Sequence, residues 1–131
     1  MTNVLCVSDE WNLGFEELRA LSNAGFRVIP VPNGYEAVKQ FAAREIEAII
    51  VNRRVADIEI ADLLSFFRHH DETIPIVMLS SAMPVPSVPA TVDAVIQKSS
   101  GAGLLVPTLQ LLLANRDSEA VLENSGLAQA A

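Results

Sequence analysis

Four sets of polar side chains that can bind ions or phosphate each follow a short apolar run in this sequence. They are Ser8, Asp9 and Glu10 after the first run, Asn52, Arg53 and Arg54 after the third, Ser80 after the fourth and Lys98 after the fifth. Carboxylates bind divalent cations, whereas hydroxyl and ammonium groups bind anions. These groups can act together only if the fold brings the ends of the runs to one place, so the elements that carry them decide the chemistry.

The apolar runs have the composition of buried strands. Each run is short, rich in Val and Ile, and bounded by polar residues, Gly or Pro. Four of the five are almost wholly apolar, as strands are when helices cover both faces of a parallel sheet. The runs cover residues 4–7, 27–31, 48–51, 74–79 and 94–97.

The segments between the first four runs keep the spacing of amphipathic helices. One begins near residue 15 and stops before Gly25, which can take a left-handed cap; a second follows Asn33. A third begins near Ile60 and ends in the cations of residues 68–70. This alternation predicts a doubly wound α/β domain with a five-stranded parallel sheet. Because ligands bind beyond the carboxyl ends of such strands, the four polar sets are predicted to converge.

The connection between the fourth and fifth runs breaks this pattern. It contains Pro84, Pro86 and Pro89, and a proline inside a helix costs about 3 kcal/mol. We therefore expect an irregular Pro-rich segment in place of a fourth helix.

The last helical segment has an apolar stripe that includes Leu105 and Leu109, with Pro107 expected in or near its first turn. The residues after 116 either form a further short helix or continue this one. We expect two regions, a globular domain over residues 1–116 and a helical extension or tail over residues 117–131.

The charge and composition of the chain argue against several classes of function. Nine basic and 16 acidic residues give a formal net charge of −7, and the basic residues are scattered, which argues against binding nucleic acid. The single cysteine, Cys6, leaves no disulfide framework. The N-terminus does not read as a signal peptide, and the longest apolar stretch is far shorter than the roughly 20 residues of a membrane span. We expect a soluble, cytoplasmic protein.

Five stretches, in order, resemble the receiver domain of two-component response regulators. They are VLCVSDE, NAGFRVIPVPNGYEAV, EAIIVNRRV, TIPIVMLSS and AVIQKS, which together span nearly the whole chain. The resemblance implies a flavodoxin-like fold that takes a phosphoryl group onto an aspartate with the help of Mg²⁺.

The residues that would perform this chemistry are altered. The family's phospho-acceptor aspartate falls on Asn52, whose amide cannot form an acyl phosphate. Its acidic pair after the first strand falls on Ser8 and Asp9, so one of two metal-supporting carboxylates is a hydroxyl. The resemblance is therefore to a degenerate receiver.

The switch residues match in part. The family's switch hydroxyl is met by Ser80 and its phosphate-pairing lysine by Lys98. The position of the family's switch aromatic is Val95 in this sequence, and an aliphatic side chain cannot swing as an aromatic ring does. The position of the proline that usually follows the lysine is Ser99. The phosphorylation-driven switch is thus expected to be lost.

An altered pocket of this kind suggests a hypothesis for its charges. Mg²⁺ prefers anionic oxygens, and only Asp9, with Glu10 nearby, remains to supply them, so we expect metal binding to be weak or absent. We hypothesise that Asp9 pairs with Lys98 or Arg54 and that Asn52 donates a hydrogen bond.

Plainer interpretations exist for each of these residues. Asp9 and Glu10 can simply favour a helix N-terminus, Lys98 can be a solvated charge, and Arg53 and Arg54 can form a solvated loop at the pocket rim. An unrelated nucleotide-binding α/β domain is a further alternative, but no GxGxxG or P-loop motif follows the first run.

We expect a non-enzymatic pseudo-receiver that needs no cofactor and signals through protein contacts. Its expected partner is a histidine kinase or an output protein, and a homodimer is possible, with neither nucleic acid nor membrane as a partner. The alternative is a receiver-fold sensor of a small ligand or anion in the altered pocket.

Overall fold

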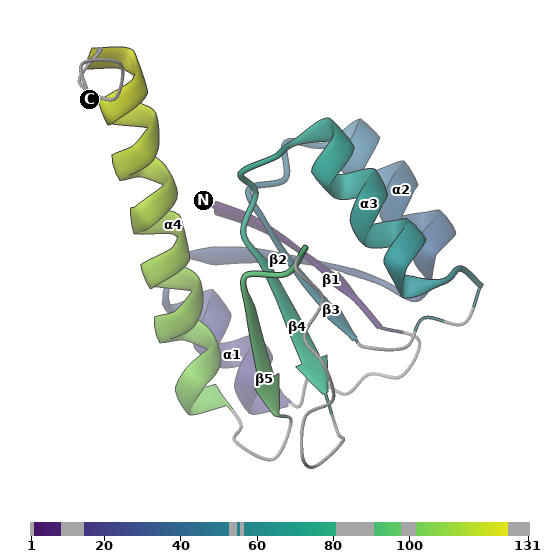
Figure 1. Ribbon diagram of the computed structural model, residues 1–131. Helices are drawn as coiled ribbons and strands as arrows, with labels where there is room; N and C mark the ends of the chain where they lie inside the picture. The colour runs from purple at the N-terminus through teal and green to yellow at the C-terminus, as the bar shows by residue number, and fades with distance from the viewer. Residues whose placement is uncertain are drawn as a thin grey trace.

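A computed structural model describes residues 2–8, 15–52, 55, 57–80, 91–97 and 102–125. Within them lies one five-stranded sheet in which every pair of neighbouring strands is parallel, in the order β2-β1-β3-β4-β5 (Figure 1). The strands are β1 (Thr2–Val7), β2 (Phe26–Val31), β3 (Ala48–Asn52), β4 (Ile76–Ser80) and β5 (Ala94–Gln97). The predicted doubly wound α/β fold is confirmed.

Helices cover both faces of this sheet. They are α1 (Phe15–Asn23), α2 (Gly34–Ala43), α3 (Ile60–His70) and α4 (Ala102–Ser125). Figure 1 shows α2 and α3 on one face and α1 and α4 on the other. Accordingly the buried apolar residues form two clusters, one beneath α2 and α3 that includes Phe67, and one beneath α1 and α4 that includes Leu109.

Position in the sheet explains the residue types of the strands. All residues of β3 and β4 are buried, which is why these two runs are apolar with no alternation. By contrast, β2 pairs only with β1 and is an edge strand. Its exposed Pro30 is tolerated there because an edge strand has backbone N–H groups without a ladder partner.

Local signals fix the helix ends. Gly25 has a φ of 91°, the left-handed conformation expected of a glycine in the turn that ends α1. At the start of α2 the side chain of Asn33 accepts a hydrogen bond from the backbone N–H of Glu36 at 2.9 Å. As predicted, α3 ends in three basic residues, Arg68, His69 and His70.

The start of the last helix places Pro107 close to its expected position. Because α4 begins at Ala102, Pro107 is its sixth residue and lies in the second turn, next to the first. The exposed ring removes one backbone hydrogen bond to the carbonyl of Gly103. The helix is continuous to Ser125, so the residues after 116 continue it and do not form a separate helix.

The expected Pro-rich irregular segment falls in residues 81–90, which lie outside the described residues. Among the helices that are described, none is long and apolar enough to cross a membrane.

Candidate functional site

The carboxyl edge of the sheet brings together three of the polar residues singled out in the sequence. Asn52 ends β3, Ser80 ends β4, and Ser8 directly follows β1. The strands that carry them are neighbours, with Val7 opposite Val51 and Asn52 opposite Leu79. Because β1 connects to β2 on one side and pairs with β3 on the other, this edge is the topological switch point of the sheet.

The side chain of Asn52 is bonded across the gap between β1 and β3. Its Nδ2 donates a hydrogen bond to Ser8 Oγ at 2.8 Å. Asn52 is 5% exposed and Ser80 is 1% exposed, so both lie inside the protein. The buried amide thus occupies the position at which the resemblance places a phosphorylated carboxylate.

One atom of this amide is unsatisfied. Asn52 Oδ1 is buried and accepts no hydrogen bond, the only such side-chain atom among the described residues. An acceptor in that state costs about 1–3 kcal/mol relative to one that stays hydrated. Among the described residues of the site, the buried unpaired atom is therefore an acceptor and not a donor.

The described part of this edge does not fit Mg²⁺. Its polar groups are the hydroxyls of Ser8 and Ser80 and the amide of Asn52, all uncharged, whereas Mg²⁺ is held through anionic oxygens. No cluster of three or more His, Cys, Asp or Glu side chains that could hold a metal occurs within the described ranges.

Several residues of the sequence hypothesis cannot be placed. Asp9, Glu10, Arg53, Arg54 and Lys98 lie outside the described residues. The proposed pairing of Asp9 with Lys98 or Arg54 therefore remains a hypothesis.

Val95 lies on β5, one strand beyond Ser80. It is partly buried, faces Met78 of β4 in the register, and packs against the apolar cluster beneath α2 and α3. An aliphatic side chain in that place has no ring to exchange between an inward and an outward position.

Asp57 is a structural residue that sequence reasoning missed. Its carboxylate accepts hydrogen bonds from the backbone N–H groups of Gly34 at 2.8 Å and Tyr35 at 3.0 Å, at the start of α2. These two bonds, the Gly34 bond foremost, hold the pKa of Asp57 below its ordinary value. These bonds connect the loop at Asp57 to the start of α2. In the sequence, the only signal for them was an acidic residue in the loop after the third run.

Close packing strengthens this junction. A Cβ atom added to Gly34 would overlap the side chain of Ile58, so a larger residue at this position requires Ile58 to move. We call Gly34, Tyr35, Asp57 and Ile58 the α2 clamp.

At the opposite edge of the sheet, Arg68 joins α3 to the starts of β4 and β5. Its guanidinium donates to the carbonyls of Ile74 and Thr91 and pairs with Asp93 at 2.8 Å. Asp93 in turn accepts from the backbone N–H of Ile76 at 2.8 Å. This network was not predicted, because residues 25 positions apart contribute to it.

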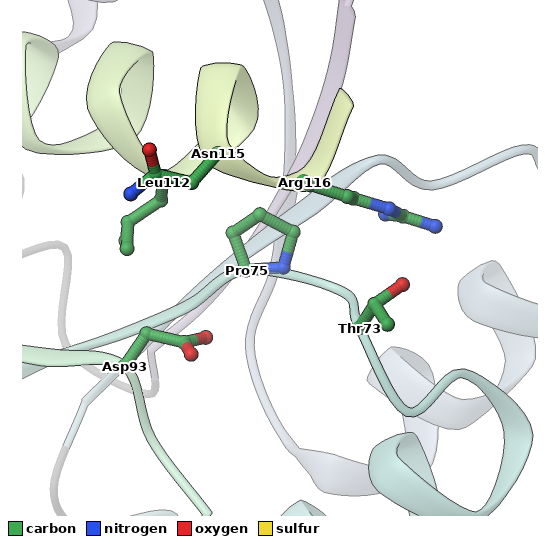
Figure 2. Close-up of a pocket in the computed structure, with 6 residues that line it drawn as sticks. All are labelled: Thr73, Pro75, Asp93, Leu112, Asn115 and Arg116. Carbon is green, nitrogen blue, oxygen red and sulfur yellow. The ribbon is translucent and has the colours of Figure 1, made fainter. Parts of the chain in front are cut away.

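A small cavity of about 160 Å³ lies beside this network. Figure 2 shows Arg116 pointing away from Asp93 and Leu112, and its guanidinium pairs with Asp71 at 2.8 Å. The charges around the cavity are thus already paired, and we assign it no ligand. Its lining residues are Thr73, Pro75, Asp93, Leu112, Asn115 and Arg116.

Comparison with known proteins gives a clear result only at the level of structure. No protein-family model and no curated protein matches the chain. Solved structures match over most of its length. The response regulator TrrA from Thermotoga maritima, in complex with Mg²⁺-BeF, is 22% identical, with 86% of this chain and 99% of that one covered and a TM-score of 0.74.

Two other structures agree with this result. A CheY-like receiver domain from Methanospirillum hungatei is 17% identical, covers 91% of this chain and 98% of its own, and has a TM-score of 0.79. A putative response regulator from Chloroflexus aurantiacus is 24% identical, with 86% and 98% covered and a TM-score of 0.76. The chain has the flavodoxin-like receiver fold.

Proposed function

We propose that this protein is an atypical receiver module that acts in signal transduction through protein contacts and without aspartyl phosphorylation. One observation carries the proposal: the side chain at the end of β3 is a buried amide whose Nδ2 is bonded to Ser8. The receiver fold supplies the context, because the structures that share it are response-regulator receivers.

The chemistry of the amide supports this function. Phosphoryl transfer to a receiver needs a carboxylate oxygen as nucleophile and a cation to neutralise the phosphoryl charge. Asn52 supplies no carboxylate, and its nitrogen is already a hydrogen-bond donor to Ser8. We therefore propose a protein with no enzymatic role and no need for a cofactor.

The residues that link the pocket to the output surface support the same function. Val95 has no ring to move when the pocket changes, and Ser80 is fully buried. We propose that the protein works in one conformation, as a cytoplasmic scaffold bound by a histidine kinase or an output protein.

Incubation with acetyl phosphate and Mg²⁺ tests the proposal. The wild-type chain should take up no acid-stable, hydroxylamine-sensitive phosphate, measured by intact mass. An intact receiver serves as the assay control, and the Ser8→Asp/Asn52→Asp variant tests whether restoring both carboxylates restores uptake. Phosphate on the wild-type chain that hydroxylamine removes would overturn the proposal.

The alternative function, sensing of an anion in the altered pocket, has less support. The unpaired atom among the described residues of the pocket is Asn52 Oδ1, an acceptor, and an anion needs donors. In an amide-resolved NMR titration with inorganic phosphate, we expect no saturable shift at Ser8, Asn52 or Ser80. Saturable shifts at these three residues would favour the sensor.

A further inference from the structure

The start of α2 carries an exposed aromatic side chain. Tyr35 is 66% exposed, more than any other large hydrophobic side chain in the described part of the chain. Its backbone N–H donates to the carboxylate of Asp57 at 3.0 Å, within the α2 clamp. The backbone that carries the ring is therefore held in place while the ring itself is solvated. Exposed tyrosines on rigid supports are common anchors of protein interfaces.

The ring of Tyr35 already binds a cation of its own helix. Lys39 Nζ lies 5.3 Å from the ring centroid, which is a cation–π contact. The same ammonium is 3.7 Å from the carboxylate of Glu36, and the side chain of Lys39 is 54% exposed. A guanidinium is planar and more weakly hydrated than an ammonium, so it stacks on an aromatic face more readily. The exposed ring is thus suited to an arginine from another protein.

The residues around Tyr35 are mostly acidic. The stretch that leads into α3 lies beside it, because Asp57 of that stretch bonds to the start of α2. Glu59 and Asp62 are exposed, and in the described part of the structure neither carboxylate accepts a hydrogen bond or forms an ion pair. Within residues 33–40 and 57–63 the one basic residue is Lys39, and the acidic residues are Glu36, Asp57, Glu59 and Asp62.

These charges decide which kind of partner fits. The chain has a formal net charge of −7, so a second copy, or another acidic protein, is repelled by an acidic surface. A basic segment is attracted to it. An arginine in such a segment can stack on Tyr35, and further arginines can form bidentate pairs with the unpaired carboxylates of Glu59 and Asp62.

We propose that the starts of α2 and α3 form a docking surface for an arginine-bearing, basic segment of a partner protein. The docking surface consists of Tyr35, Glu59 and Asp62. It gives a chemical class to the partner of the proposed signalling module, and it rests on that function only for its biological role. Peptide binding can be measured whether or not the chain accepts phosphate, so the two proposals fail separately.

A peptide titration of the full chain tests the docking surface. Hexa-arginine is added at low ionic strength, where surface charges are least screened, and amide-resolved NMR follows the chain. The shifts should saturate and centre on Tyr35, Glu59 and Asp62. Hexa-lysine has the same charge but stacks less well, so it should bind about five-fold more weakly. Equal affinity for the two peptides, or shifts centred elsewhere, overturns the proposal.

Variants at Tyr35 test the role of the ring. Tyr35→Ala should weaken hexa-arginine binding by about five-fold and abolish the preference over hexa-lysine, whereas Tyr35→Phe keeps the ring and should bind like the wild type. Leu111→Ala is the control, because it truncates a side chain of similar exposure, 62%, on the opposite face of the sheet. A Tyr35→Ala chain that keeps its native spectrum and binds as tightly as the wild type contradicts the proposal.

A pair of double variants tests the carboxylates. Glu59→Gln/Asp62→Asn should weaken hexa-arginine binding by about three- to ten-fold at low salt, and by less as salt is added. Glu45→Gln/Glu72→Gln removes the same charge from exposed positions after α2 and after α3, and should have a much smaller effect. Equal weakening by the two double variants would mean that only net charge attracts the peptide, and the docking surface would be wrong.

Discussion

At the scale of single residues, Asn52 contributes opposing terms to stability. Its hydrogen bond to Ser8 is worth about 0.5–1.5 kcal/mol, whereas its buried, unpaired Oδ1 costs about 1–3 kcal/mol. The cost of the unpaired oxygen is therefore larger than the gain from the hydrogen bond. The buried amide of Asn52 thus makes the fold less stable, not more.

Replacing Asn52 by leucine, which has a similarly branched side chain, should raise the free energy of unfolding by about 1 kcal/mol, because it removes the unpaired oxygen together with the bond. Urea denaturation measures the change through the transition midpoint. Asn3→Leu is the matched control: the Nδ2 of Asn3 donates to the carbonyl of Glu45 at 2.8 Å in an exposed setting, so this change should only destabilise. A loss of stability in Asn52→Leu would mean that Oδ1 finds a donor in solution.

At the scale of secondary-structure elements, the α2 clamp fastens the segment after β3 to the start of α2. Asp57 accepts from two of the backbone N–H groups that a helix N-terminus leaves unpaired, and Asn33 accepts from a third, that of Glu36. The negative charge of Asp57 also lies at the positive end of the helix dipole. Helix N-termini often bind anions. At the start of α2 the bound anion is the carboxylate of Asp57, a residue of the same chain.

The contribution of the Asp57 charge should depend on pH in a defined direction. Its pKa in the folded protein is below the ordinary value of 3.8, so the unfolded chain binds the proton more tightly. The charge therefore stabilises the fold fully above about pH 5 and loses its effect as pH falls through the folded pKa.

We expect Asp57→Asn to melt at a lower temperature than the wild type at neutral pH, and the gap to narrow in acid as the wild-type carboxylate becomes protonated. Melting curves from pH 7 down to pH 3 measure the gap. Glu72→Gln is the control, since the side chain of Glu72 is exposed and accepts no hydrogen bond in the described part of the structure. A gap that is the same at every pH would show that the charge contributes nothing.

Elements set by local pattern could be predicted from the sequence, and those set by long-range contacts could not. The buried strands and the Gly25 helix stop follow from residue type and spacing within a few positions. The two Asp57 bonds join residues 23 and 22 positions apart, and the bond from Asn52 to Ser8 joins residues 44 apart. The sequence therefore indicated that Asn52 donates a hydrogen bond, while only the fold identifies the acceptor.

At the scale of the whole molecule, one sheet separates two apolar layers. Every strand contributes side chains to both, so β1 presents Leu5 to the cluster beneath α2 and α3 and Val4 to the cluster beneath α1 and α4. Neither layer can lose its packing without exposing strands that the other layer needs. The described part of the chain should therefore unfold as one cooperative unit.

Substitutions in the two layers test this cooperativity. Leu64 and Leu109 are fully buried on opposite faces of the sheet, so Leu64→Ala and Leu109→Ala should each cost about 2–5 kcal/mol. In each variant, native NMR cross-peaks of α3 and of α4 should disappear at the same urea concentration, lower than in the wild type. If α4 signals vanish first in Leu109→Ala while α3 signals keep their wild-type midpoint, the two layers unfold separately, and α4 is a docked element with its own stability.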